Sequence, residues 1–211
     1  MTSPYDAARK LASAAARLRG ECDARTPALL ALTDPDRQPD PLSLARYLPP
    51  GSALIYRHYG APDRVSIAHD TVRLAQARGV RVLISGDAAL ARDCKADGVH
   101  WPERMLAEAH RERARGHTGL FTGSVHSPAG LSRAQSSGLD AVLVSTVFVS
   151  ASSSAGHPMG PLALSAWSKR SSTPIYALGG VNTRTIKRLV GLGISGVAVV
   201  GAIRSAEPTR T

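Results

Sequence analysis

The chain has 211 residues, 43% of them apolar, which fits one domain over residues 1–211 with a sizeable core. No apolar run approaches the roughly 18 residues of a membrane span, and residues 1–20 lack the apolar stretch of a signal peptide, so we expect a cytoplasmic protein that does not bind membranes. The net charge is +10, but the arginines are scattered and aromatic residues make up only 4%, which argues against nucleic-acid binding.

Eight short apolar runs follow one another along the chain, and helix-period segments separate most of them. The runs are residues 28–32, 53–56, 80–84, 98–100, 119–125, 141–147, 174–178 and 196–200. The helical segments are residues 42–47, 65–78, 88–94, 105–115, 128–137, 162–169 and 183–192. This alternation predicts a parallel sheet, and eight strands favour a closed (β/α)8 TIM barrel over the alternative, an open doubly wound sheet.

The two ends of the chain depart from this repeat. Residues 4–19 predict an extra N-terminal helix, which we expect to plug the bottom of the barrel. Because the chain stops soon after Ala202, the last helix should be short or missing. Residues 150–156 are small and polar and read as one flexible loop.

The last two predicted strands each end at glycine. Residues 174–180 close with Gly179-Gly180, and residues 196–202 contain Val200-Gly201. Glycine at the end of a parallel strand lets backbone N–H groups come close to an anion. In an eight-stranded barrel the loops after the last two strands are the usual phosphate site, so we expect a phosphorylated small-molecule ligand.

Five ordered segments carry a family resemblance over about residues 28–203. They are Lys95-Ala-Asp-Gly-Val-His100, Gly123-Ser-Val-His-Ser127 and residues 139–148, 177–181 and 196–203. Together they resemble the thiamine phosphate synthase/TenI family of TIM barrels. One branch of that family joins a pyrimidine pyrophosphate to a thiazole phosphate with Mg²⁺. The other branch, TenI, is a tautomerase that moves a proton on a thiazole carboxylate phosphate and needs no cofactor. Family members are often dimeric, so the resemblance suggests a homodimer.

The resemblance implies a two-part site, of which the phosphate half matches. It places the thiazole phosphate on the backbone amides of Gly179, Gly180, Val200 and Gly201. In the pyrophosphate half the synthase pattern Gln-x-Arg-x-Lys aligns with Ile55-Tyr-Arg-His-Tyr59, so only Arg57 is kept as an anion clamp.

The metal-binding positions match less well. The synthase Asn-Asp pair aligns with Ser85 and Gly86, so that Asp87 offers only a weak candidate ligand for Mg²⁺, and after the fourth strand only Glu103 is at hand, out of register. In the sixth loop Ser150 and Ser152 keep two hydroxyls for substrate, whereas the lysine is gone. One charge-assisted contact is worth about 1.5–3 kcal/mol, so Arg57 alone hardly replaces Mg²⁺ and two lysines.

A proton shift needs fewer catalytic groups than the displacement of pyrophosphate. His126 follows the fifth predicted strand where TenI carries its histidine, and histidine exchanges protons near neutral pH, so His126 is the candidate catalytic residue. Ser124 beside it is expected to bind substrate. The alternative is a structural histidine. We expect His100 to be a structural or pocket-wall residue and His157 to be exposed.

Two further side chains and three functions stay open at this stage. Trp101 and Tyr56 either stack on a ligand ring or fill the core. The residues favour a TenI-like or degenerate member that binds a thiazole phosphate. The alternatives are an active synthase that also binds a pyrimidine pyrophosphate, and a barrel that binds a phosphorylated metabolite without catalysis.

Overall fold

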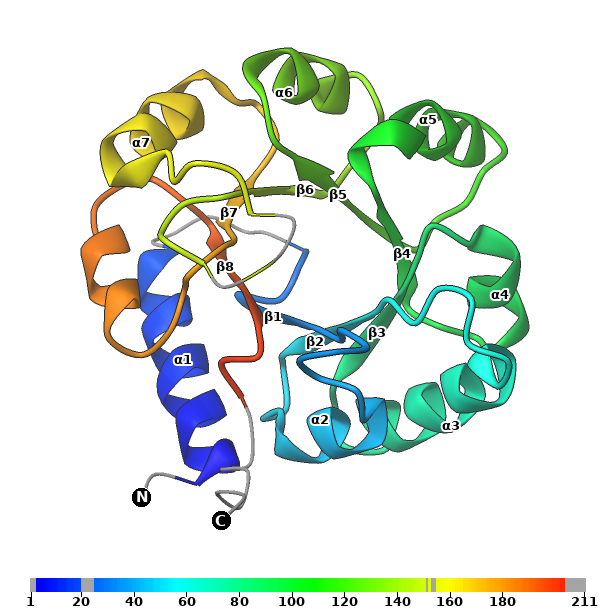
Figure 1. Cartoon of the computed structure of the whole chain (residues 1–211). Coiled ribbons are helices and arrows are strands. Elements are labelled where there is room, and N and C mark those ends of the chain that lie inside the picture. Colours follow the sequence, from blue (N-terminus) through cyan, green and yellow to red (C-terminus); the bar gives the residue numbers. More distant parts are fainter. Residues whose placement is uncertain (1–2, 20–24, 151, 153–154, 204–211) are drawn as a thin grey trace.

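Eight parallel strands close into a barrel in the computed structural model, which describes residues 3–19, 25–150, 152 and 155–203 (Figure 1). Each strand pairs with the next one along the chain, and the pairing of Leu29 with Val197 joins the last strand to the first. The predicted TIM barrel is therefore confirmed and the open sheet is wrong. The strands are β1 (Leu29–Leu32), β2 (Ala53–Tyr56), β3 (Arg81–Ser85), β4 (Gly98–Trp101), β5 (Leu120–Val125), β6 (Ala141–Val144), β7 (Ile175–Ala177) and β8 (Gly196–Val200).

Helices cover the outside of the barrel, and several start at a capped residue. The side chains of Asp40, Asp87 and Ser127 accept hydrogen bonds from the first-turn N–H groups of their helices, as N-cap residues do. Within the described residues no helix is long and apolar enough to cross a membrane. The helices are α2 (Pro41–Tyr47), α3 (Arg64–Gln76), α4 (Ala88–Asp93), α5 (Leu106–Ala114), α6 (Pro128–Gln135) and α7 (Gly160–Arg170), with a 3-10 turn η1 (Glu103–Met105) before α5.

The helix expected over residues 183–192 is reduced to the 3-10 helix η2 (Thr185–Leu189). The Asn182 side chain accepts hydrogen bonds from the N–H groups of Arg184 and Thr185, which holds the start of the segment in a tight turn. Gly191 and Gly193, both with positive φ, end the helical stretch. The prediction of an α-helix here is wrong.

The N-terminal helix α1 (Pro4–Leu18) exists as predicted but does not plug the barrel. It buries Ala8, Leu11 and Ala15 and contacts β1, β8, α2 and η2. In Figure 1 it lies outside the barrel, between η2 and α2. It therefore takes the place of an eighth outer helix in the ring. The prediction of a short or missing last helix falls on residues 204–211, outside the described residues.

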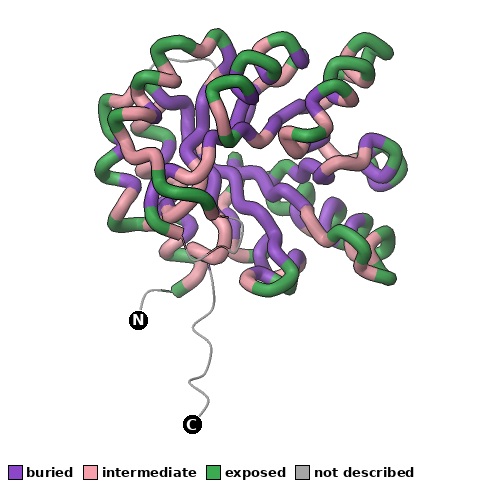
Figure 2. Tube along the Cα trace, turned by 45° about the horizontal axis from the view of Figure 1, so that its top comes forward, coloured by how far each residue is buried: buried purple, intermediate pink, exposed green. Residues whose placement is uncertain are grey.

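The barrel has an inner and an outer core. The inner core fills the closed sheet with side chains from seven of the strands, including Leu30, Ile55, Leu143 and Tyr176. A larger apolar layer lies between the strands and the helices. Figure 2 shows the buried residues gathered along the strands and the exposed ones along the outer faces of the helices. Because the interior is packed, a ligand must bind at one end of the barrel.

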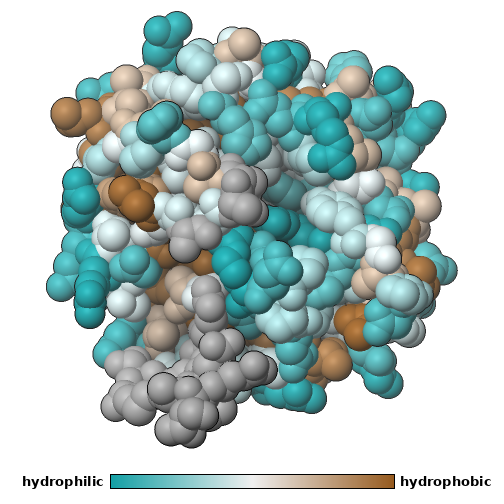
Figure 3. All heavy atoms as spheres, in the orientation of Figure 1, coloured by the Kyte–Doolittle hydropathy of each residue, from teal (hydrophilic) through white to brown (hydrophobic). Residues whose placement is uncertain are grey.

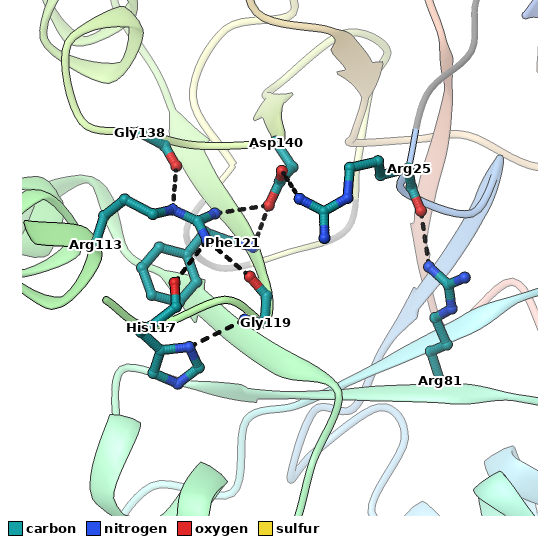
Figure 4. A network of polar contacts seen from close by, with 8 residues as sticks. All are labelled: Arg25, Arg81, Arg113, His117, Gly119, Phe121, Gly138 and Asp140. Atoms are coloured by element: carbon teal, nitrogen blue, oxygen red, sulfur yellow. Dashed lines mark hydrogen bonds and ion pairs between the residues drawn. The ribbon is translucent and has the colours of Figure 1, made fainter. Parts of the chain in front are cut away.

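Polar contacts hold the loops at the N-terminal end of the barrel together. The Arg113 guanidinium, on α5, donates hydrogen bonds to the carbonyl oxygens of His117, Gly119 and Gly138 and to the carboxylate of Asp140 (Figure 4). It also lies over the ring of Phe121, 4.1 Å from the ring centre. On the opposite side of this end, the Arg19 side chain donates to the Tyr176 hydroxyl and to the Ser195 carbonyl oxygen. These contacts leave the loops at the opposite, C-terminal end free to form a cavity.

Candidate functional site

A cavity of about 360 Å³ opens at the C-terminal ends of the strands, between the loops that follow them. In Figure 3 hydrophilic residues prevail near the centre of the face that is shown. The walls combine positive side chains, hydroxyls and glycine backbone. Most residues that the sequence singles out line this one cavity: Arg57, Ser124, His126, Ser150, Ser152, Gly179, Gly180, Val200 and Gly201.

Gly179 and Gly180 form the part of the wall best suited to a phosphate. Both have positive φ, +94° and +65°, and a side chain has no room at either position. A Cβ atom would lie 2.8 Å from the Thr146 side chain at Gly179 and 2.4 Å from the Val149 carbonyl oxygen at Gly180. Within the described part of the chain the N–H groups of both glycines have no hydrogen-bond partner. Two successive unpaired N–H groups can converge on one anion.

Two arginines form the opposite, positively charged part of the wall. Arg57 lies 3.5 Å and Arg37 lies 2.7 Å from the same carboxylate oxygen of Asp34. Burial disfavours ionisation of Asp34, but hydrogen bonds and charge from Arg37, together with the charge of Arg57, outweigh it and lower its pKa. Two cations share one carboxylate, so this end of the cavity keeps an excess of positive charge. No sequence motif singles out Arg37. Its position in the loop after the first strand is the one sign that it could line the cavity.

His126 lies in the cavity wall beside Glu103, which the sequence offers only as a metal ligand. Its Nδ1 is 2.8 Å from Glu103 Oε2, and its backbone N–H donates to the same oxygen at 2.8 Å. The imidazole is 56% exposed. A half-exposed imidazole in the cavity wall, hydrogen-bonded on one side, has the arrangement of a proton-transfer group.

His100 behaves as a structural residue, as expected. Its ring is buried and lies 2.9 Å from the hydroxyls of both Thr122 and Ser124. Burial, with smaller contributions from the positive charges of Arg57 and His126, lowers the pKa of His100 to about 3. A neutral His100 therefore positions the Ser124 hydroxyl, which lines the cavity.

Ser85 and Asp87 are not brought into the cavity with the other predicted residues. Ser85 is fully buried and hydrogen-bonded by the Tyr59 hydroxyl. Asp87 accepts the N–H of Leu90 as the cap of α4 and lies 2.7 Å from the Arg64 guanidinium. Burial opposes its ionisation, but these hydrogen bonds and the Arg64 charge lower its pKa. Asp87 thus has a structural role that accounts for its carboxylate.

The donor set does not fit a Mg²⁺ ion held by protein carboxylates. Mg²⁺ needs oxygen ligands in octahedral geometry. Among the described residues no group of three or more histidine, cysteine, aspartate or glutamate side chains comes together. The carboxylates of Asp34, Asp87 and Glu103 are each paired with arginine. Binding a metal would require breaking one of these pairs.

Four further aromatic and histidine residues do not line the cavity. Trp101 and Tyr56 are buried in the outer core, and the Tyr56 hydroxyl donates to the Arg64 carbonyl oxygen. Their alternative role in stacking on a ligand is wrong. The His58 ring bonds the Thr33 hydroxyl and the Pro39 carbonyl oxygen. His157 is exposed.

The fold and the cavity define the class of protein: a (β/α)8 barrel with a pocket lined by arginine, hydroxyl and glycine residues at the C-terminal ends of its strands. Comparison with known proteins narrows this class. The family model described as "Thiamine monophosphate synthase" matches residues 31–203. The chain belongs to the thiamine phosphate synthase/TenI family.

Individual relatives agree with this membership. A putative thiamine-phosphate synthase of Geobacter sulfurreducens is 31% identical over 140 residues, which are 66% of each protein. The thiamine-phosphate synthase of Chlorobium phaeobacteroides is 28% identical over 86% of this chain and 91% of that protein. The thiamine phosphate pyrophosphorylase structure from Pyrococcus furiosus superposes with a TM-score of 0.70 at 21% identity, over 91% of this chain and 90% of that one. This likeness shows the fold. The aligned region makes up just under two thirds of the length of the Geobacter relative.

Proposed function

We propose that the chain binds a thiazole phosphate and catalyses a TenI-type proton shift on a thiazole carboxylate phosphate, with His126 as the acid–base residue. The observation that carries the proposal is the composition of the cavity: glycine N–H donors at one side, arginines at the other, and a carboxylate-bound histidine between the strands' ends. The ligand's phosphate would lie on the N–H groups of Gly179 and Gly180 and beside Val200 and Gly201. Its second anionic group would lie toward Arg37 and Arg57.

The reaction needs only His126 and a bound substrate. The imidazole nitrogen that does not contact Glu103 takes a proton from a carbon of the thiazole unit. The same nitrogen then returns a proton to another atom of the conjugated system, so charge and atoms balance without a co-reactant. Ser124, Ser150 and Ser152 supply hydroxyls that orient the ring.

Pyrophosphate displacement is less well supported by the same cavity. The leaving pyrophosphate requires several kcal/mol of stabilisation from metal and cations. The cavity offers two arginines, and the nearby carboxylates are paired. The names of the relatives nevertheless make synthase activity the second candidate.

Three measurements on the purified chain separate these functions. Tautomerisation of thiazole carboxylate phosphate, followed by NMR, should occur and should fall at least about 100-fold in His126→Gln. Thiamine phosphate formation, followed by thiochrome fluorescence with both synthase substrates and Mg²⁺, should be absent. Thermal stabilisation by thiazole phosphate without turnover would instead identify a non-catalytic binding barrel. Thiamine phosphate formation would overturn the proposal in favour of the synthase.

A further inference from the structure

The Glu103 side chain contacts residues of the loop after β5 and of α6, far from its own turn in the sequence. It lies in the 3-10 turn η1 after β4, and its side chain is only 17% exposed. One carboxylate oxygen receives the backbone N–H and the Nδ1 of His126, each at 2.8 Å. The other oxygen lies 2.8 Å from the Arg133 guanidinium of α6 and 3.5 Å from the Ser127 hydroxyl. Glu103 therefore ties the end of β4 to the loop after β5.

We propose that Glu103 is a positioning residue that fixes His126 in the tautomer with the proton on Nδ1, and so leaves Nε2 as the proton-accepting atom in the cavity. The inference rests on the proposed function for its catalytic meaning. An ionised carboxylate only accepts hydrogen bonds, so the His126 nitrogen facing it must carry hydrogen. In the neutral ring the other nitrogen then holds the lone pair.

Both oxygens of Glu103 face donors, which makes a carboxylate specific for this position. The His126 N–H groups approach Oε2, and the Arg133 guanidinium approaches Oε1. A glutamine amide has one oxygen and one NH2 group. With its oxygen turned to His126 and its NH2 group to the exposed Arg133, a glutamine would still accept the Nδ1 hydrogen. Glu103→Ala removes both acceptor oxygens and should release the tautomer of His126.

Gly130 on α6 gives the carboxylate its space. A Cβ atom at Gly130 would lie 2.2 Å from Glu103 Oε1. Its φ is not in the left-handed region, so alanine suits the helix at this position. Gly130→Ala therefore displaces the carboxylate while leaving its charge in the protein. This gives a second, independent way to disturb the contact with His126.

The test is histidine tautomer analysis by NMR on the full chain labelled with 15N-histidine. His126→Gln assigns the His126 signals by their loss. In the wild type at a pH where His126 is neutral, Nδ1 should be protonated and Nε2 should carry the lone pair. In Glu103→Ala and in Gly130→Ala the signals should move toward a mixture of tautomers. Glu112→Ala is the matched control, because Glu112 is likewise a carboxylate paired with arginine, here Arg92 and Arg115, and does not line the cavity.

The outcomes separate this inference from the proposed function. A wild-type protein with Nε2 protonated, or variants that leave the tautomer unchanged, overturn the role of Glu103 whatever the activity. If the tautomer responds as expected and no tautomerase activity is found, the positioning of His126 stands and the proposed reaction fails. If both hold, Glu103→Ala should lower kcat about tenfold and leave KM nearly unchanged, because the substrate's anionic groups are bound elsewhere.

Discussion

At the scale of single residues, Gly180 in the loop after β7 leads to the first prediction, with Gly191, after η2, as its control. Gly180→Ala and Gly191→Ala both place alanine at positive φ, which costs about 1 kcal/mol. A Cβ atom at Gly191 meets nothing within 4 Å, whereas at Gly180 it meets the Val149 carbonyl oxygen. Gly180→Ala should therefore lose about 1–3 kcal/mol more stability in urea denaturation, and with it the thermal shift caused by thiazole phosphate. Gly191→Ala should keep that shift; equal losses in both variants would contradict the clash.

A second residue-scale prediction concerns pH. The pKa of His100 is about 3 in the folded chain, against about 6.5 for an unfolded histidine. Below pH 6.5 the unfolded chain gains a proton at this position that the folded chain does not, so stability falls as pH drops toward 3. Between pH 7 and pH 4.5 this amounts to about 2–3 kcal/mol. His100→Gln should be less stable at pH 7 but lose correspondingly less between these two pH values; the same loss in both proteins would mean that His100 does not stay neutral.

At the scale of the elements, Arg113 joins α5 to β5 and to the loop before β6 (Figure 4). Arg113→Ala leaves three carbonyl oxygens without this donor and removes a cation from Asp140. We expect a loss of about 2–4 kcal/mol in the free energy of unfolding, measured with urea. Arg111→Ala is the matched control, because Arg111 is exposed and its ion pair with Glu108 is long, at 3.8 Å. This variant should change stability by less than about 0.5 kcal/mol. Similar losses in both variants would argue against the network.

Apolar periodicity in the sequence predicts the position of the strands and of α1, but not which surface a helix covers. The apolar runs at residues 53–56 and 196–200 coincide with β2 and β8, because a fully buried parallel strand reads as an uninterrupted apolar stretch. The helical pattern of residues 4–19 predicts α1 but not its partner, because an apolar stripe does not say which surface it covers. Over residues 183–192 the pattern fails because the Asn182 side chain stabilises a competing turn.

For the site, the order of strands was enough to bring most predicted residues together, since C-terminal strand ends meet at one rim. Pairings between loops far apart in sequence were not predictable. Arg37 lines the cavity and forms an ion pair with Asp34. Glu103 contacts His126, which lies 23 residues further along the chain. Asp87 looked available in the sequence, but the Arg64 side chain of α3 pairs with it. Such partners are set by packing between elements rather than by local spacing.

At the scale of the whole molecule, the net charge of +10 and the paired carboxylates lead to a prediction about metal. The excess of positive charge at the cavity attracts anionic ligands, and more strongly at low salt. Because Asp34, Asp87 and Glu103 already have arginine partners, none of these three offers a metal ion a free carboxylate. Thiazole phosphate should therefore raise the melting temperature equally in EDTA and in millimolar Mg²⁺, and the shift should decrease with added salt. Arg37→Gln should reduce the shift, since it removes a cation from the wall. A shift that appears only with Mg²⁺ would mean that the carboxylates leave their arginines to bind the ion, and the phosphate pocket would then depend on metal as in a synthase.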